Sequence, residues 1–337
     1  MKILIIGYGL IGKERLKALE ELVNIDKKEI NIIGIVDPVF KNNDYKEKLN
    51  YTIFENLSEF SFYNNKKSID WVFICTPHFE TVNILNYFKD YNCNFLVEKP
   101  LGRDINEFKL FKSKFNKNIK IYVGFNYRFF QGINLMLQDI KNKIFGDLIS
   151  VNLTLAHGNS PGMEKSWKLN KQMCGGGALL DPGIHLIDLA MLISNNTLSL
   201  ISFAQWEGFW NTGIDEDIHI IAKSSDKTIY NFNISLVRWR STFKIEINGT
   251  EGYGIVSGRG KSYGDQSYTR GKRWGWLNSK SQKDSEELVL LNYNCNDSFY
   301  NETKLILYKT NTTDIIHPAT DLDNEKSLEF INSIYKL

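Results

Sequence analysis

Three side chains that can move or stabilise a proton stand in two short motifs of this 337-residue chain. Lys99 lies between Glu98 and Pro100, while Asp181 and His185 follow a run of three glycines. A histidine titrates near neutral pH and can accept a hydroxyl proton, whereas a lysine ammonium can stabilise a developing alkoxide. The set is typical of a site that adds or removes a proton at a substrate hydroxyl.

A glycine-rich turn lies upstream of these motifs, directly after the apolar run 3–6. Its residues are Gly7-Tyr8-Gly9-Leu10-Ile11-Gly12. In such a turn the first glycine permits the tight bend, the second lets the backbone approach a pyrophosphate, and the third lets the helix pack on the strand. The helix that follows presents N–H groups and a favourable dipole to an anion. We therefore expect residues 7–12 to bind a dinucleotide.

Two further segments belong with the expected cofactor site. Asp37 ends the apolar run 32–36, where a carboxylate can accept hydrogen bonds from the adenosine ribose hydroxyls. It would repel a 2′-phosphate, which favours NAD over NADP; the alternative is that Asp37 only caps the strand before a proline turn. Further along, the backbone of Thr76, Pro77 and His78 should line the nicotinamide side of the cofactor site.

Composition limits the other classes of function. A hydrophobic content of 42% can supply the cores of two domains, and a net charge of +2 argues against nucleic acid or a membrane surface as the main partner. The four widely spaced cysteines form no CxxC pair, which favours free thiols in a reducing compartment and predicts no metal site. The first apolar run is short and broken by glycines, so we expect neither signal peptide nor membrane span, and a cytoplasmic location.

The first 125 residues alternate short apolar runs with amphipathic stretches. Buried parallel strands are predicted at 3–6, 32–36, 71–75, 95–97 and 121–123, and helices at 11–22, 79–91 and 105–115. Lys99 and the other predicted site residues of this half follow the strands, where ligands collect in open α/β sheets. This half is expected to be a doubly wound Rossmann domain, residues 1–125.

The pattern changes beyond residue 125. Helices are predicted at 133–144, near 182–193 and at 324–335, and half-buried antiparallel strands at 150–156, 200–206, 218–222, 229–237 and 242–247. Asp181 is expected to cap the second helix with Pro182 in its first turn, so that His185 lies near the same face. Residues 126–337 should form an α+β domain with a large, mostly antiparallel open sheet, and the last helix is a candidate to pack back on the first domain.

A basic, aromatic segment spans residues 258–283. It carries seven Lys or Arg residues against one acid, a net charge of +6, and its basic residues are Arg259, Lys261, Arg270, Lys272, Arg273, Lys280 and Lys283. Tyr263, Tyr268, Trp274 and Trp276 are interleaved with them. Such a segment could grip a phosphate or carboxylate and stack on a sugar or base, or it could be a solvated loop or a subunit contact.

These motifs together resemble the Gfo/Idh/MocA family, which includes glucose-fructose oxidoreductase and inositol dehydrogenase. The resemblance covers nearly the whole chain: the glycine turn, Glu98-Lys99-Pro100-Leu101, residues 124–129 (GFNYRF), Trp167, Asp181-x-Gly183-x-His185 and residues 246–252 (EINGTEG). His78 and Thr81 depart from the Asn and His that the family often has after the Thr-Pro pair, so no side-chain role is assigned to them.

The resemblance implies a Rossmann domain, an open-sheet substrate domain and a homodimer or homotetramer formed through the sheet. Lys99, Asp181 and His185 match the family's catalytic lysine, aspartate and histidine, and Tyr127, Arg128 and Trp167 would line a sugar pocket. The expected reaction transfers a hydride between NAD and a secondary hydroxyl or ketone of a sugar or cyclitol, including nucleotide-linked or anionic sugars of surface-polysaccharide metabolism.

Either His185 or Lys99 could accept the hydroxyl proton; we favour His185, with Asp181 as its orienter, because a lysine needs a large pKa shift to act as a base. Two alternatives share the fold: a sensor that binds NAD and sugar without turnover, and an NAD-dependent redox glycosidase. Proton-transfer groups argue against a pure sensor.

Overall fold

The structure is a computed structural model that describes residues 1–41, 49–64, 68–115, 119–282, 285–292, 297–309 and 316–336. Its contacts divide the chain into two compact units. Unit 1 comprises Met1–Phe125, Phe299–Asn311 and Pro318–Asn324, and unit 2 comprises Asn126–Ser298, Thr312–His317 and Glu325–Leu337. Two C-terminal segments thus group with unit 1. The expected domain bounds, 1–125 and 126–337, stay a prediction.

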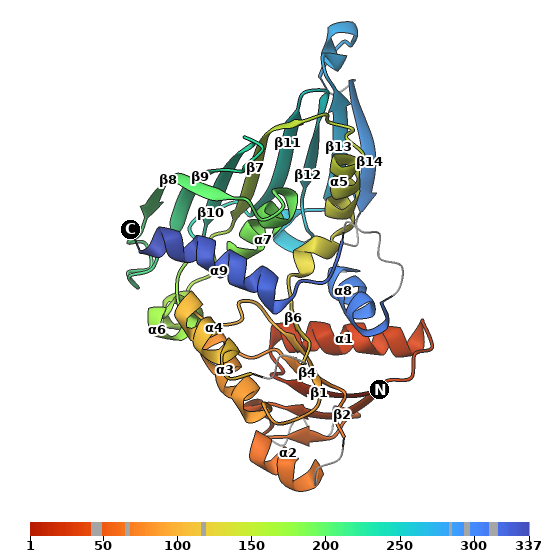
Figure 1. The fold of residues 1–337 in the computed structure, drawn as a ribbon, viewed down its shortest axis with the longest axis vertical. Coiled ribbons are helices and arrows are strands. Elements are labelled where there is room, and N and C mark those ends of the chain that lie inside the picture. Colours follow the sequence, from red (N-terminus) through yellow and green to blue (C-terminus); the bar gives the residue numbers. More distant parts are fainter. Residues whose placement is uncertain are drawn as a thin grey trace. The chain divides into compact units, whose positions relative to one another are not determined.

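Unit 1 is built on a six-stranded parallel sheet in the order β3-β2-β1-β4-β5-β6 (Figure 1). This is the strand order of a Rossmann fold, and it confirms the predicted doubly wound sheet. The strands are β1 (Lys2–Ile6), β2 (Asn31–Val36), β3 (Ile53–Phe54), β4 (Trp71–Ile74), β5 (Asn94–Val97) and β6 (Ile121–Val123). The chain reverses its winding direction between β1 and β4, which is where such sheets bind their ligands.

Helices cover both faces of this sheet. They are α1 (Leu10–Asn24), α2 (Leu57–Asn64), α3 (His78–Tyr87), α4 (Ile105–Lys112) and α8 (Asp297–Tyr308). Leu16, Leu19 and Leu22 of α1 pack with Ile306 and Leu307 of α8 in one core cluster against one sheet face. On β5, the ring of Phe95 contacts two other phenylalanines. Phe88 directly follows α3, and Phe115 lies three residues after the end of α4. Apolar strands enclosed from two sides explain why their sequences read as continuous hydrophobic runs.

Unit 2 contains an eight-stranded sheet in the order β14-β13-β12-β11-β7-β10-β9-β8. Its strands are β7 (Leu148–Ala156), β8 (Ser199–Trp206), β9 (Asp217–Lys223), β10 (Ile229–Ser235), β11 (Thr242–Gly249), β12 (Gly252–Ser257), β13 (Gln266–Lys272) and β14 (Glu286–Asn292). All adjacent strands are antiparallel except β7 and β10. The mostly antiparallel sheet is confirmed, although the prediction that all five strands were antiparallel is wrong for that pair.

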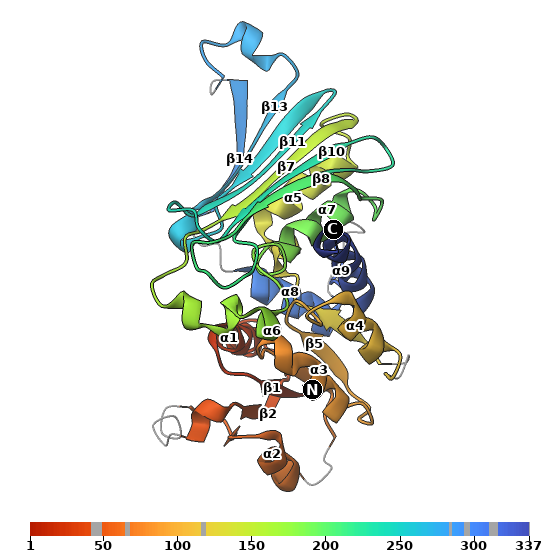
Figure 2. The same cartoon turned by 90° about the vertical axis from the view of Figure 1, so that its left-hand side faces the viewer.

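One face of this sheet carries helices α5 (Gln131–Lys141), α7 (Ile184–Ile193) and α9 (Asp321–Tyr335), as both views show (Figures 1 and 2). A short helix, α6 (Lys171–Cys174), lies in the loop before α7. The apolar residues 328, 331 and 334 of α9 are buried, as their spacing predicted. From Glu325 onward α9 belongs to unit 2.

Five of the helices and strands described beyond residue 125 were absent from the sequence prediction: β12, β13, β14, α6 and α8. The β12 strand contains two glycines and β13 contains one, so neither shows a run of alternating apolar residues. Edge strand β14 has no fully buried residue, which removes the burial pattern that the prediction relied on. In unit 1, the short elements β3 and α2 were also missed.

Candidate functional site

In unit 1 the predicted cofactor residues meet at one sheet edge. Strand register aligns Ile6 with Val36 and with Ile74, and Ile74 with Val97. The residues that follow these strand ends begin at 7, 37, 75 and 98, so all four segments leave the sheet along its carboxyl edge. Backbone hydrogen bonds from Gly7 N to Val36 O and from Cys75 N to Ile6 O, 2.8 and 2.7 Å, close the turns together. Parallel pairing therefore collects segments that are distant in sequence.

The three turn glycines occupy different surroundings. Gly7 has a φ of +93°, and a Cβ there would lie 2.5 Å from the Cys75 carbonyl oxygen. A Cβ on Gly12 would overlap the Gly7 carbonyl oxygen, so strand and helix pack too closely for a side chain. A Cβ on Gly9 would meet nothing within 4 Å. Gly9 caps α1 without any side-chain hydrogen bond, which leaves the helix N-terminus open to a phosphate and fits a dinucleotide.

Asp37 is held against the glycine turn. Its Oδ2 accepts a hydrogen bond from the Tyr8 backbone N–H at 2.6 Å, and its Oδ1 accepts one from Val39 N–H at 2.8 Å. Each carboxylate oxygen can accept more than one hydrogen bond, so both can also receive ribose hydroxyls. Asp37 thus caps its strand end, as the simpler interpretation had it, and also stands where the adenosine ribose would bind.

Glu98, which stands between β5 and Lys99, is held by a buried ion pair. Arg15 of α1, fully buried, donates from Nε to Glu98 Oε1 at 2.7 Å and pairs with Glu302 at 2.6 Å. Burial alone would lower the pKa of Arg15, but Glu302 and Glu98 together hold it above its ordinary value. The carboxylate of Glu98 therefore fixes the strand end that carries Lys99, and the Lys99–Pro100 peptide bond is cis.

Thr76, Pro77 and His78 lead into α3 at the same edge. Pro77 is the N-cap residue and His78, which is buried, is the first residue of the helix. The Thr76 hydroxyl oxygen is enclosed and finds no hydrogen-bond partner in the part of the chain that the structure describes. A role for these residues toward the nicotinamide stays a prediction.

In unit 2, the phenol ring of Tyr127 stacks on the imidazole of His185. Their centroids are 3.8 Å apart with an interplanar angle of 3°, and both side chains are 5% exposed. Tyr127 belongs to the 3-10 turn η3 (Asn126–Phe129), and His185 is the second residue of α7. Burial raises the pKa of the Tyr127 hydroxyl, which keeps the phenol neutral. The stack fixes the plane of the histidine.

Asp181 does not cap the helix as predicted. Helix α7 begins at Ile184, Gly183 is its N-cap residue, and the Asp181–Pro182 peptide bond is cis. The Asp181 carboxylate accepts a hydrogen bond from Lys168 Nζ at 3.2 Å, a charge-assisted contact. Because Asp181 precedes the helix, the helical spacing from which we expected it beside His185 does not apply, and its role as the orienter of that ring stays a prediction.

Two residues near Asp181 escaped the sequence prediction. Asp181 raises the pKa of Lys168. His157, directly after β7, has a pKa lowered first by burial and then by Arg259, with Asp181 opposing the shift. Its Nδ1 accepts the Asn159 backbone N–H at 3.2 Å. The position of His157 at the end of a predicted strand was the signal that could have revealed it.

The glycine run before Asp181 is organised by Asp215. The Gly177 and Leu179 backbone N–H groups donate to its carboxylate at 2.9 and 2.7 Å, and the Tyr335 hydroxyl donates at 2.8 Å. A Cβ on Gly177 would collide with the Asp215 backbone. Gly177 is therefore needed because the backbone of another segment approaches closely, and this contact cannot be seen in the local sequence.

Two expected sugar contacts have other surroundings. The Arg128 guanidinium is buried and forms paired hydrogen bonds with Asp188, at 2.7 and 2.6 Å, and its Nη1 also donates to the His317 carbonyl at 3.2 Å. This arrangement suits holding the turn that carries Tyr127. Trp167 begins a 3-10 turn, η5 (Trp167–Leu169), and the Lys168 ammonium lies 5.7 Å from its ring centroid. Their sugar contacts stay predictions.

The basic segment 258–283 is not one loop. Strand β13, seven residues long, separates its two ends. Arg259 lies 5.4 Å from the Tyr127 ring centroid, whereas Arg273 stacks on Trp274 at 4.1 Å beyond the other end of β13, in the connection to β14. Arg270 within the strand pairs with Asp139 and Glu287. Lys283 lies outside the described residues. Only the end that carries Arg259 adjoins the stack.

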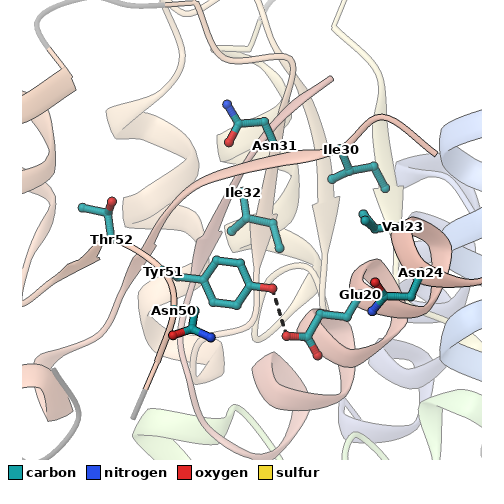
Figure 3. Close-up of a pocket in the computed structure, with 9 residues that line it drawn as sticks. All are labelled: Glu20, Val23, Asn24, Ile30, Asn31, Ile32, Asn50, Tyr51 and Thr52. Carbon is teal, nitrogen blue, oxygen red and sulfur yellow. Dashed lines mark hydrogen bonds between the residues drawn. The ribbon is translucent and has the colours of Figure 1, made fainter. Parts of the chain in front are cut away.

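A cavity of about 370 Å³ also lies in unit 1 (Figure 3). Glu20 and Tyr51 face each other across it, joined by a hydrogen bond of 2.9 Å from the tyrosine hydroxyl. Asn31 lines it and pairs with Lys2, the first residue of β1. The cavity is therefore at the amino edge of the sheet, away from the glycine turn. In the described ranges no helix is long and apolar enough to cross a membrane.

A parallel sheet with a glycine turn at its switch point, together with an open, mostly antiparallel sheet, defines a two-unit oxidoreductase with an NAD(P)-binding Rossmann fold. Residues 1–125 match the oxidoreductase family with NAD-binding Rossmann fold, and residues 134–254 match the GFO/IDH/MocA C-terminal domain. The chain belongs to the Gfo/Idh/MocA family, as the sequence motifs indicated.

Two relatives of known activity are similar over part of their length. The levoglucosan dehydrogenase of Pseudarthrobacter phenanthrenivorans is 32% identical over 120 residues, 35% of this chain and 31% of the relative. The glucose-6-phosphate 3-dehydrogenase of Bacillus subtilis is 25% identical over 197 residues, 56% of this chain and 52% of the relative. This chain thus matches about a third of the first relative and about half of the second.

Solved structures show the same fold along the whole chain. A 3-ketoreductase from Actinomadura kijaniata, in complex with NADP and TDP-benzene, superposes with a TM-score of 0.76 at 12% identity and covers 100% of this chain and 97% of its own. A dehydrogenase from Bordetella pertussis, in complex with NADH and UDP-GlcNAcA, gives 0.76 at 13% identity, with 100% and 95% covered. At these identities the likeness shows the fold alone.

Proposed function

We propose that this protein is an NAD-dependent dehydrogenase of a sugar or cyclitol, which transfers a hydride between nicotinamide and a secondary hydroxyl or ketone. The observation that carries the proposal is the Tyr127–His185 stack in a chain whose other unit has an NAD(P)-type turn. The two relatives with known activity are both sugar dehydrogenases by name, which supports the substrate class.

The residues of unit 1 have the shape to hold the cofactor. The backbone N–H groups at the start of α1 would bind the pyrophosphate, and Asp37 would accept the ribose hydroxyls. A carboxylate at that position supports NAD over NADP. When bound, the nicotinamide supplies the acceptor of the hydride.

The proton of the substrate hydroxyl needs a separate acceptor. We assign it to His185, whose ordinary pKa lies near neutrality and whose ring plane is fixed by Tyr127. Lys99 would stabilise the negative charge that develops on the hydroxyl oxygen. In the reverse direction the same histidine returns the proton to the alkoxide as the ketone is reduced.

Assembly through the outer face of the eight-stranded sheet belongs to the same proposal. Polar side chains with partial exposure run across its central strands, including Asn231, which donates to Asn152 at 2.9 Å, and Lys244, which pairs with Glu246 at 2.6 Å. Such a face can form a wet interface between two copies. Light scattering behind size-exclusion chromatography tests for a homodimer or homotetramer; a monomer at all concentrations would refute this part.

The function is tested with the purified protein and a panel of free sugars, cyclitols and nucleotide sugars. Thermal shift with NAD present identifies ligands of the native state, because a ligand bound only to that state raises its stability. NADH formation with a stabilising sugar supports the dehydrogenase. Binding without NADH formation would favour the sensor, and release of an aryl group from an aryl glycoside would favour the redox glycosidase.

A further inference from the structure

One arginine of this protein differs from the other buried and half-buried arginines, which have side-chain partners. Arg15, Arg128 and Arg270 face carboxylates, which are Glu98 and Glu302, Asp188, and Asp139 and Glu287 respectively, and Arg238 donates to Asn233 at 3.0 Å. Arg259 is half-buried and its Nε is enclosed, yet it makes no hydrogen bond or ion pair with the residues that the structure describes. A guanidinium carries five N–H donors and stays charged, so a ligand is the natural partner.

The guanidinium of Arg259 is held in place by aromatic rings. Its central carbon lies 3.8 Å from the ring centroid of Tyr263 and 5.4 Å from that of Tyr127. Contacts with ring faces restrain the plane of a guanidinium and leave its N–H edges available. Tyr127 in turn stacks on His185 at 3.8 Å. The N–H donors of Arg259 are therefore held in a fixed direction, and the ring of Tyr127 lies between them and the expected base, His185.

The charges around this arginine leave a positive excess. Asp181 is the acid that acts on this cluster, and it already pairs with Lys168 at 3.2 Å. The side chains of His157, Tyr127 and Tyr263 complete the cluster around Arg259. The two cations and one carboxylate sum to +1, a charge that an anionic group of a ligand would neutralise.

The sheet brings this cluster together. Arg259 follows β12 and His157 follows β7, and the intervening strand β11 aligns the two ends, since Thr242 pairs with Ala156 and Lys244 with Ser257. Both loops therefore leave the same sheet edge, two strand spacings or about 10 Å apart. The site belongs to the rigid part of unit 2.

We propose that Arg259 recognises an oxyanion on the substrate, a carboxylate or a phosphate ester, through paired hydrogen bonds, so that this enzyme takes anionic sugars. The inference rests on the proposed function, because it takes the Tyr127–His185 stack to be the place where the sugar is oxidised. Paired bonds from a planar guanidinium match both oxyanions, so the two sources share one chemistry.

The kinetic test compares D-glucuronate, glucose 6-phosphate and D-glucose as substrates with NAD. Arg259→Gln removes the cation, Arg259→Lys keeps the charge but not the paired donors, and Arg273→Gln is the matched control from the far end of β13. We expect Arg259→Gln to lower kcat/KM for the preferred anionic sugar about 10- to 100-fold, mostly through KM, with D-glucose changed less than about threefold. Arg259→Lys should fall between, and Arg273→Gln should equal the wild type.

A binding measurement separates this inference from the proposed function. Calorimetric titration of both anionic sugars into the protein with NADH present needs no turnover. Binding that Arg259→Gln weakens about tenfold or more supports the inference, even if no sugar is oxidised and the dehydrogenase proposal fails. Three results would overturn the inference. Arg259→Gln could lower the oxidation of neutral and anionic sugars equally, it could bind both anionic sugars as the wild type does, or the wild type could bind neither anion.

Discussion

Tyr127 and His185 lie with their rings parallel, 3.8 Å between centroids, although 57 residues separate them in the chain. An imidazole in this arrangement cannot rotate without losing the stack, so its nitrogens keep their directions. The Arg128–Asp188 ion pair holds the two segments together, since each of its members lies close in sequence to one of the two rings. The stack is thus a structural property of unit 2.

His185→Ala should lower kcat about 10²- to 10⁴-fold, because the hydroxyl proton loses its acceptor. Tyr127→Phe retains the stacked ring and should keep activity within about tenfold, and Lys99→Ala should lower kcat by removing charge stabilisation. Steady-state NADH formation measures all three. Wild-type rates in both His185→Ala and Lys99→Ala would sink the assignment.

Gly9→Ala and Gly12→Ala should separate cofactor binding from stability. Gly9→Ala places a methyl group in open space, so the free energy of unfolding should change by less than about 1 kcal/mol. The affinity for NADH should fall about tenfold or more. The second forces its methyl into the Gly7 carbonyl and should destabilise by about 1–3 kcal/mol. Fluorescence titration with NADH and chemical denaturation measure the two effects, and equal NADH affinity in Gly9→Ala and the wild type would contradict the site.

Asp37→Asn should reduce the preference for NAD over NADP by about tenfold, because it removes the negative charge that opposes a 2′-phosphate. The amide offers one acceptor oxygen in place of two, so either Tyr8 N–H or Val39 N–H loses its partner. The ratio of kcat/KM for the two cofactors is the measurement. A wild-type enzyme that prefers NADP would refute the role of Asp37.

Asp215→Asn should destabilise the protein by about 1–3 kcal/mol, because an amide cannot accept hydrogen bonds at both oxygen positions from the glycine run and Tyr335. Tyr335→Phe is the milder comparison, since it removes one donor and leaves both backbone contacts; we expect about 1 kcal/mol. Urea unfolding gives both values. A larger loss in Tyr335→Phe than in Asp215→Asn would show that the carboxylate is not the organiser.

His157 should make the protein less stable as the pH falls. Burial, with Arg259 and Lys168 adding to it, lowers its pKa in the folded state below the unfolded value of about 6.5. The unfolded state therefore binds the proton first, so the contribution of His157 is present above about pH 6.5 and is lost as the pH drops through the folded pKa. His157→Gln should show a shallower fall in Tm from about pH 6.5 to 5. An unchanged dependence of Tm on pH in His157→Gln would show that His157 does not cause the loss of stability.

Much of unit 1 could be predicted from sequence because its determinants are local. Buried parallel strands are continuous apolar runs, and Gly7 and Gly12 each meet a steric constraint from a neighbouring backbone. Capping rules apply within one turn, whereas the Asp181 carboxylate accepts its hydrogen bond from an ammonium 13 residues away, which explains the failure of the capping prediction.

By itself the sequence determined the family, the doubly wound Rossmann sheet and the glycine-rich turn, because motif and periodicity are properties of neighbouring positions. The roles of the proton-transfer residues stay predictions. Tertiary structure alone decided the stack of Tyr127 on His185, the hold of Asp215 on the glycine run, and the division of the basic segment that left Arg259 beside the stack. These depend on strand register and on which distant segments share a sheet edge, and chain spacing carries no record of either.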